Sequence, residues 1–117
     1  MKEFENILSQ IQDDMRNGMY HNSNLHECFD THVSLKGWES YIMGLIEQLE
    51  IKEIRRMKEN TENNKSEAAK RNAWKSTENG ETQSILESQL KRAEKISSTL
   101  LTIYYKGRDE HKQNIIK

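Results

Sequence analysis

The 117-residue chain contains no proline, only one cysteine and only five glycines. Proline is the strongest helix breaker, so its absence leaves long helices unobstructed. The lone Cys28 excludes an internal disulfide, and the fold therefore does not need an oxidising compartment. No run approaches the ~20 apolar residues of a membrane-spanning helix, and residues 1–5 lack the apolar core of a signal peptide. We therefore expect a cytoplasmic protein with no membrane partner.

Apolar residues are also scarce, at 33% of the sequence. Ordinary globular proteins contain roughly 45–50%, with glycine included, and five glycines do not close that gap. This is too little for a thick core, but enough for one apolar stripe on each of a few long helices. The composition predicts a thin helical bundle or an oligomer.

Charged residues make up 32% of the chain and nearly cancel, at 18 basic and 19 acidic side chains. Residues 1–50 carry three basic and nine acidic side chains, a net charge of −6. Residues 51–75 carry eight basic and four acidic side chains, a net charge of +4. The middle of the chain is therefore the candidate electropositive patch.

In the first half, apolar residues recur every three or four positions, which is the spacing of one helical face. They predict a helix over residues 1–16, ended by Asn17-Gly18, and a long helix over residues 25–59. Gly37 and Gly44 each cost up to about 1 kcal/mol against alanine, so a break near residues 34–37 is the competing interpretation. The stripe of the long helix consists of Cys28, His32, Leu35, Trp38, Ile42, Leu45 and Leu49.

The second half begins with a polar turn at residues 59–65 and a short helix over residues 66–76, capped by Ser66. A loop at residues 77–80 then precedes a long helix over residues 81–106, and Gly107 starts a polar tail to residue 117. The stripe of this helix consists of Leu86, Leu90, Ala93, Ser97, Leu100 and Tyr104.

These patterns predict an all-α fold for the single domain 1–117. It is an elongated helical hairpin or bundle, with two long antiparallel helices and two or three shorter helices laid across them. Ile46, Ile51 and Ile54 lie off the main stripe of their helix and indicate a second apolar face. Burying that face on an identical copy would give a homodimer or a higher homo-oligomer.

Three of the four histidines and the only cysteine fall within twelve residues, as His21, His26, Cys28 and His32. Zinc accepts this mixture of nitrogen and sulfur ligands. However, Cys28 and His32 also lie on the apolar stripe, and the four donors lack the paired spacing of zinc sites. The sequence from His26 resembles the His-Glu-x-x-His motif, but its fifth position is Asp30. We therefore expect no metal ligand and no cofactor.

Glu47, Glu50 and Glu53 recur at three-residue steps, and Glu78 with Glu81 could form a second pair. Helical magnesium-dependent nucleotide pyrophosphohydrolases hold their metal with such carboxylates, and this enzyme class is the minor alternative. Glutamate is equally typical of a solvated helix face. The sequence has no nucleophile elbow and no glycine-rich phosphate loop, so we expect no catalytic residue.

The basic segment supports a second alternative, a nucleic-acid-binding accessory protein. Cations would follow the phosphates while a tryptophan stacks on a base. A net charge of only +4 predicts modest, salt-dependent affinity. The candidate residues are Arg55, Arg56, Lys70, Arg71, Trp74 and Lys75.

Our main hypothesis is a non-enzymatic helical module that binds another protein. An acidic surface guides the encounter with a basic partner, and tryptophan and tyrosine are frequent interface anchors. The abundance of lysine, asparagine, isoleucine and glutamate is associated with AT-rich genomes, so an accessory or inhibitor protein of a phage or mobile element fits this hypothesis. The candidate interface consists of Trp38, Tyr41, Asp13, Asp14, Glu39 and Glu47.

Overall fold

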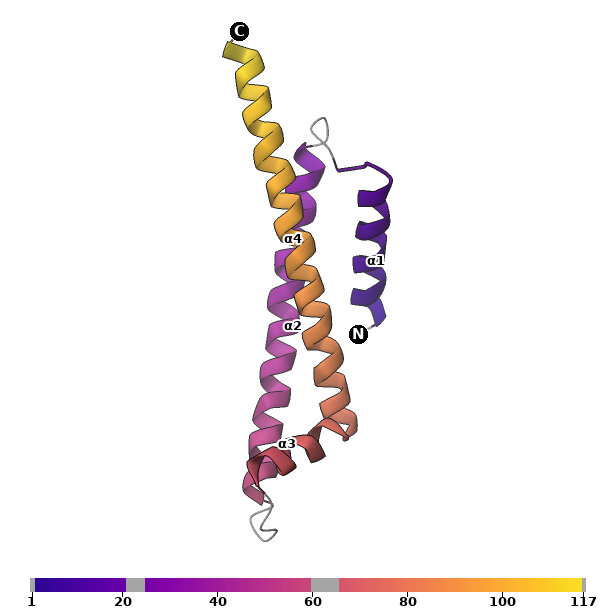
Figure 1. Cartoon of the computed structure of the whole chain (residues 1–117), viewed down its shortest axis with the longest axis vertical. Helices are drawn as coiled ribbons and strands as arrows, with labels where there is room; N and C mark the ends of the chain where they lie inside the picture. The colour runs from indigo at the N-terminus through magenta and orange to yellow at the C-terminus, as the bar shows by residue number, and fades with distance from the viewer. Residues whose placement is uncertain (1, 21–24, 60–65, 117) are drawn as a thin grey trace.

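The computed structural model describes residues 2–20, 25–59 and 66–116 (Figure 1). In these ranges it contains four helices and no strand. The all-α class and the pair of long helices are confirmed. The helices are α1 (Lys2–Arg16), α2 (Leu25–Glu59), α3 (Glu67–Lys75) and α4 (Glu78–Ile116).

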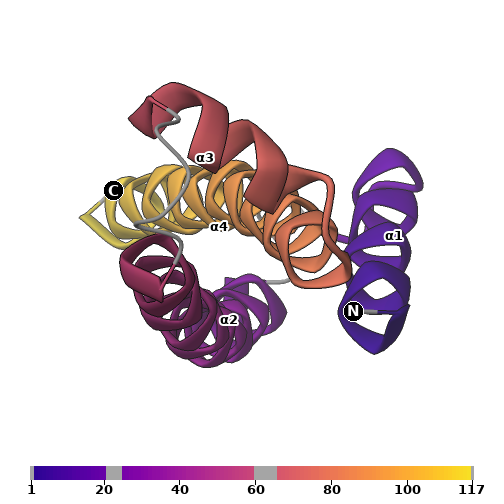
Figure 2. The same cartoon turned by 90° about the horizontal axis from the view of Figure 1, so that it is seen from below.

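The two long helices pack side by side in antiparallel directions, and their contact is the most extensive in the structure (Figure 1). Seen from the end, α4 lies in the middle, with α2, α3 and α1 around it (Figure 2). Only α3 lies across the pair, whereas α1 runs alongside it. The molecule measures 74 × 25 × 18 Å, with a radius of gyration of 20.0 Å, against about 13 Å for a compact domain of this length.

The interface between α2 and α4 follows a heptad pattern. On α2, the buried positions Leu35, Glu39, Ile42, Ile46 and Leu49 alternate in steps of four and three. This is the 3.5-residue repeat of helices that pack lengthwise. Placing Ile46 off the main stripe was wrong, because the structure buries it in the core.

Trp38 and Leu45 were assigned to the main stripe, but both are only half-buried. Trp38 instead stacks on Phe4 of α1, with ring centroids 5.4 Å apart. Trp38 is three residues after Leu35 and Glu39 is four, and either spacing can keep two side chains on the same face of a helix. In the heptad repeat of α2, Glu39 takes the core position. Trp38 therefore faces α1 instead of α4.

Neither Gly37 nor Gly44 breaks α2, which is continuous over 35 residues. The predicted polar tail after Gly107 is wrong, since α4 continues to Ile116. Glycine costs a helix only about 1 kcal/mol, which its neighbours in the helix can offset.

The predicted loop at residues 77–80 is the start of α4. Thr77 acts as the N-cap, because its Oγ1 accepts a hydrogen bond from the Gly80 backbone N–H at 3.1 Å. Gly80 also lies against α3, where an added Cβ would be 1.8 Å from the Trp74 carbonyl oxygen. The glycine therefore permits the tight corner between α3 and α4, and it does not end a helix.

Candidate functional site

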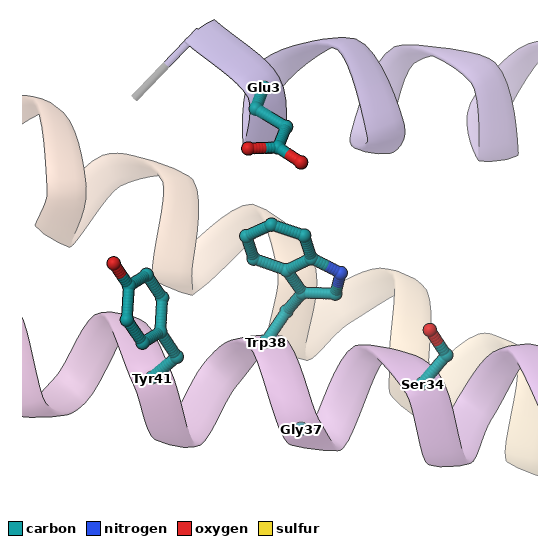
Figure 3. A pocket seen from close by; sticks show the side chains of 5 residues that line it. All are labelled: Glu3, Ser34, Gly37, Trp38 and Tyr41. Atoms are coloured by element: carbon teal, nitrogen blue, oxygen red, sulfur yellow. The ribbon is translucent and has the colours of Figure 1, made fainter.

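A shallow groove of about 470 Å³ lies between α1 and α2, lined by Glu3, Ser34, Gly37, Trp38 and Tyr41. Gly37, Trp38 and Tyr41 follow Ser34 by three, four and seven positions, so the four α2 residues lie on one helical face. Figure 3 shows Glu3 pointing from α1 toward the indole of Trp38, with Tyr41 and Ser34 on either side along α2. We call this the α1–α2 groove.

Aromatic packing fixes the wall of the groove. The Trp38 ring is nearly parallel to that of Phe4, at an interplanar angle of 11°, and Phe4 is fully buried. Tyr41 meets Trp38 edge-on, with centroids 6.1 Å apart and an angle of 82°. These are the two preferred geometries of aromatic pairs. The indole is therefore held in place from one side, while Tyr41 remains 54% exposed.

Gly37 lies between the side chains that line the groove. A Cβ built at this position would meet no atom within 4 Å. The internal packing of the chain therefore does not require a glycine here. Its effect is to leave the α2 backbone accessible between Ser34, Trp38 and Tyr41.

The position of Glu3 depends on how α1 is attached to α4, and Arg92 makes that attachment. Its guanidinium forms an ion pair with Glu5 and donates hydrogen bonds to Ser9 Oγ at 3.2 Å and Gln12 Oε1 at 3.0 Å. These three partners lie on successive turns of α1. One α4 side chain therefore aligns much of α1 along the bundle.

The same contacts affect the ionisation of Glu5. The hydrogen bond from Arg92, followed by one from Gln89 at 3.3 Å, lowers the pKa of the Glu5 carboxyl below its ordinary value. The carboxylate is therefore charged at neutral pH. The Glu5 carboxylate neutralises the charge of Arg92. The exposed Glu3 therefore gives the groove its negative charge.

Aromatic rings beside a carboxylate form a surface that suits a cation. The face of an indole or phenol ring attracts ammonium and guanidinium groups, and a carboxylate accepts charge-assisted hydrogen bonds from them. Lys36 does not fill this position, because its Nζ lies 3.3 Å from Glu39 Oε2, and residue 36 is outside the groove face.

Of the six candidate interface residues, the structure brings together Trp38 and Tyr41. Asp13 pairs with Arg16 at 3.5 Å, and Asp14 accepts a hydrogen bond from Gln10, both away from the groove.

Glu47 is exposed, about two turns beyond the groove along α2. Glu39 was wrongly placed on the surface, because its side chain is only 6% exposed. Its heptad position turns it inward despite its charge.

Sequence reasoning missed three of the residues that line the groove. Ser34 and Gly37 could have been found from their spacing to Trp38 and Tyr41. Glu3 could not, because no local signal shows which helix α1 covers.

The six candidate nucleic-acid residues do not form the expected stacking site. Trp74 is 5% exposed, and its Nε1–H donates to Gln83 Oε1 at 3.0 Å. Its ring is therefore packed inside and not available to a base. Lys70 is half-buried, and four cations remain exposed: Arg55, Arg56, Arg71 and Lys75.

Arg71 lies in a second hollow of about 320 Å³, which it shares with Glu50 and Glu53. These carboxylates reduce the positive potential that the net charge of the segment predicts.

The cysteine and histidines of the candidate metal cluster point to different partners. His26 pairs with Asp30 at 3.1 Å, whereas His32 Nδ1 lies 2.9 Å from Ser97 Oγ on α4. Cys28 is fully buried, and this burial raises the pKa of its thiol. His21 lies outside the described residues.

In the part of the chain that the structure describes, no three His, Cys, Asp or Glu side chains are grouped to hold a metal ion. This applies equally to the glutamates of the pyrophosphohydrolase alternative.

Comparison with models of known protein families, with curated proteins and with solved structures finds no match. None of the helices in the described ranges combines the length and hydropathy needed to cross a membrane.

Proposed function

We propose that this chain is a non-enzymatic helical interaction protein that binds a basic segment of another protein. The observation that carries the proposal is the α1–α2 groove, which combines a fixed indole, an exposed phenol and a carboxylate. A lysine or arginine side chain of the partner would lie against Trp38 and Tyr41 and donate to Glu3. The net charge of −6 over residues 1–50 would favour the approach of a basic partner.

An arginine satisfies this groove better than a lysine. Its planar guanidinium stacks on aromatic faces and donates two hydrogen bonds at once to a carboxylate. The groove is open along α2, so neighbouring residues of the partner segment would continue over Ser34 and Gly37.

The test uses two labelled peptides that differ only in charge, an alternating arginine–glycine peptide and its citrulline counterpart. Fluorescence anisotropy at low salt should detect binding of the arginine peptide alone. Tyr41→Ala and Glu3→Gln should each weaken it about tenfold, which corresponds to about 1.4 kcal/mol. Glu94→Gln removes one negative charge on the exposed surface of α4, outside the groove, and is the matched control.

Equal binding of both peptides, or equal loss in the control variant, would refute the role of the groove. A charge reversal of Arg71 and Lys75 to glutamate separates the nucleic-acid alternative, because it should leave peptide binding intact. A gel shift at ~50 mM salt that this reversal abolishes would favour the nucleic-acid alternative.

We also propose that the chain self-associates. Its low apolar content is arranged along long helices, and much of what remains exposed is concentrated on α2. A dimer would present two α1–α2 grooves, which raises the effective affinity for a partner with repeated basic segments.

A further inference from the structure

Nine large hydrophobic side chains are exposed in the part of the chain whose side chains the structure describes, and the outer face of α2 carries five of them: Phe29, Val33, Met43, Ile51 and Ile54. Each is between 43% and 53% exposed. At 100° per residue they fall within an arc of about 80°, on the side of the helix away from α1. We call this the outer stripe of α2. Isolated exposed apolar residues are ordinary, whereas a row of them on one helix is typical of an interaction surface.

The outer stripe has a symmetric order along the helix. Reversing α2 about residue 42 places Val33 opposite Ile51, and Phe29 within one residue of Ile54. The same reversal places Ser40 opposite Gly44, so two small residues lie on either side of Met43 near the centre. A surface that matches its own reverse is what an isologous two-fold interface requires.

The charges of α2 follow the same symmetry. Residues 25–50 carry five acidic side chains and one basic, whereas residues 51–59 carry four basic and two acidic. In the reversed copy, Asp30 would approach Arg55 at one edge of the stripe. Lys36 would lie near Glu47. Parallel helices would instead place like charges opposite each other, which costs stability.

Gly44 gives an independent reason for close approach near the centre. An added Cβ at Gly44 would meet nothing within 4 Å, yet the glycine weakens the helix by about 1 kcal/mol. The packing of the chain itself therefore does not require a glycine at this position. A second helix crossing at residues 40–44 would, because small residues let two backbones approach closely.

We infer that two copies of this chain pair through the outer stripe of α2, antiparallel, about a two-fold axis near residue 42. The inference rests on the proposed self-association and adds its surface, direction and register. The α1–α2 groove lies about a third of a turn away around α2, so both grooves of the dimer stay accessible beside the interface.

The first measurement is light scattering behind size exclusion over a range of protein concentrations. The full-length chain should be a dimer, and Val33→Glu or Ile51→Glu should raise its dissociation constant about 100-fold, because each places an unpaired carboxylate in an apolar interface. Ile85→Glu is the matched control, since Ile85 is equally exposed but lies on α4. Circular dichroism checks that every variant remains helical.

Oxidative cross-linking then tests direction and register in a Cys28→Ala background. A chain with both Val33→Cys and Ile51→Cys should form a covalent dimer, and each single variant should not. A monomer at all concentrations would refute self-association itself. A dimer that resists Val33→Glu, or that cross-links through Val33→Cys alone, would leave self-association standing and overturn this interface.

Discussion

Replacing Glu39 with leucine should make the protein more stable. Glu39 occupies a buried heptad position of α2, one turn from Leu35 and Ile42, which are both fully buried. Among the residues that the structure describes, neither carboxylate oxygen of Glu39 has a hydrogen-bond partner. The carboxylate forms an ion pair with Lys36 Nζ at 3.3 Å, and the Lys36 side chain is 56% exposed. The contact is therefore close enough for attraction but not aligned as a hydrogen bond.

Three contributions set the magnitude for Glu39→Leu. Burying a leucine side chain stabilises a fold by about 1.5–3 kcal/mol, and removing an unsatisfied buried polar group recovers about 1–3 kcal/mol. Losing an ion pair with an exposed lysine costs at most about 1 kcal/mol. Because the burial and polar contributions overlap, we expect the free energy of unfolding to rise by about 2–4 kcal/mol.

Urea unfolding followed by circular dichroism at 222 nm measures this change. All variants are compared at one low protein concentration at which light scattering shows monomers. Lys36→Met is the informative control, because it removes the counter-charge and leaves the carboxylate buried, so it should lower stability. If Glu39→Leu destabilised the fold, the carboxylate would not be the unsatisfied group that the geometry indicates. If Lys36→Met had no effect, the ion pair would contribute nothing to stability.

Three further changes test other parts of the fold. Gly80→Ala should destabilise the chain by about 2 kcal/mol or more, because its Cβ would overlap the Trp74 carbonyl oxygen, and a thermal melt would measure this. Arg92→Met should speed amide hydrogen exchange throughout α1 while the long helices stay protected. Acidification should also release α1 from α4. The folded-state pKa of Glu5 is lowered, so the ionised carboxylate stabilises the fold at pH values above the ordinary carboxyl pKa of about 4.3. This contribution is lost as the pH falls below that value and through the lowered pKa. Trp38 fluorescence should report that transition, and Glu5→Gln should remove it.

The helices could be predicted from the sequence because their apolar spacing and caps are local. Ser66 caps α3 through a hydrogen bond from the Ala69 N–H at 3.2 Å, as its position predicts. The heptad order within α2 could not be predicted equally well. Residue type alone favours Trp38 over Glu39 as the core residue, because tryptophan is apolar and glutamate is charged. The structure shows the opposite, since packing against α4 follows the heptad order.

The candidate site shows the same division. Trp38 and Tyr41 were predicted as contact residues because tryptophan and tyrosine are frequent interface anchors. The carboxylate of Glu3 reaches the groove because α1 packs on α4, where Arg92 contacts α1 residues that are eighty or more positions away in sequence. Trp74 was misjudged for a related reason, since its partner Gln83 lies on the next helix and no spacing rule connects them.

The glycines fall into two groups, those that the fold of the chain requires and those that it does not. Gly18 adopts a positive φ of 74° after α1, and Gly80 permits the corner between α3 and α4. Both are explained by the chain itself. Gly37 and Gly44 weaken α2 and have open space where a side chain would be. These two glycines destabilise the helix without allowing any close contact within the chain, which indicates a contact with another molecule. Both glycines lie on the part of α2 between the α1–α2 groove and the outer stripe.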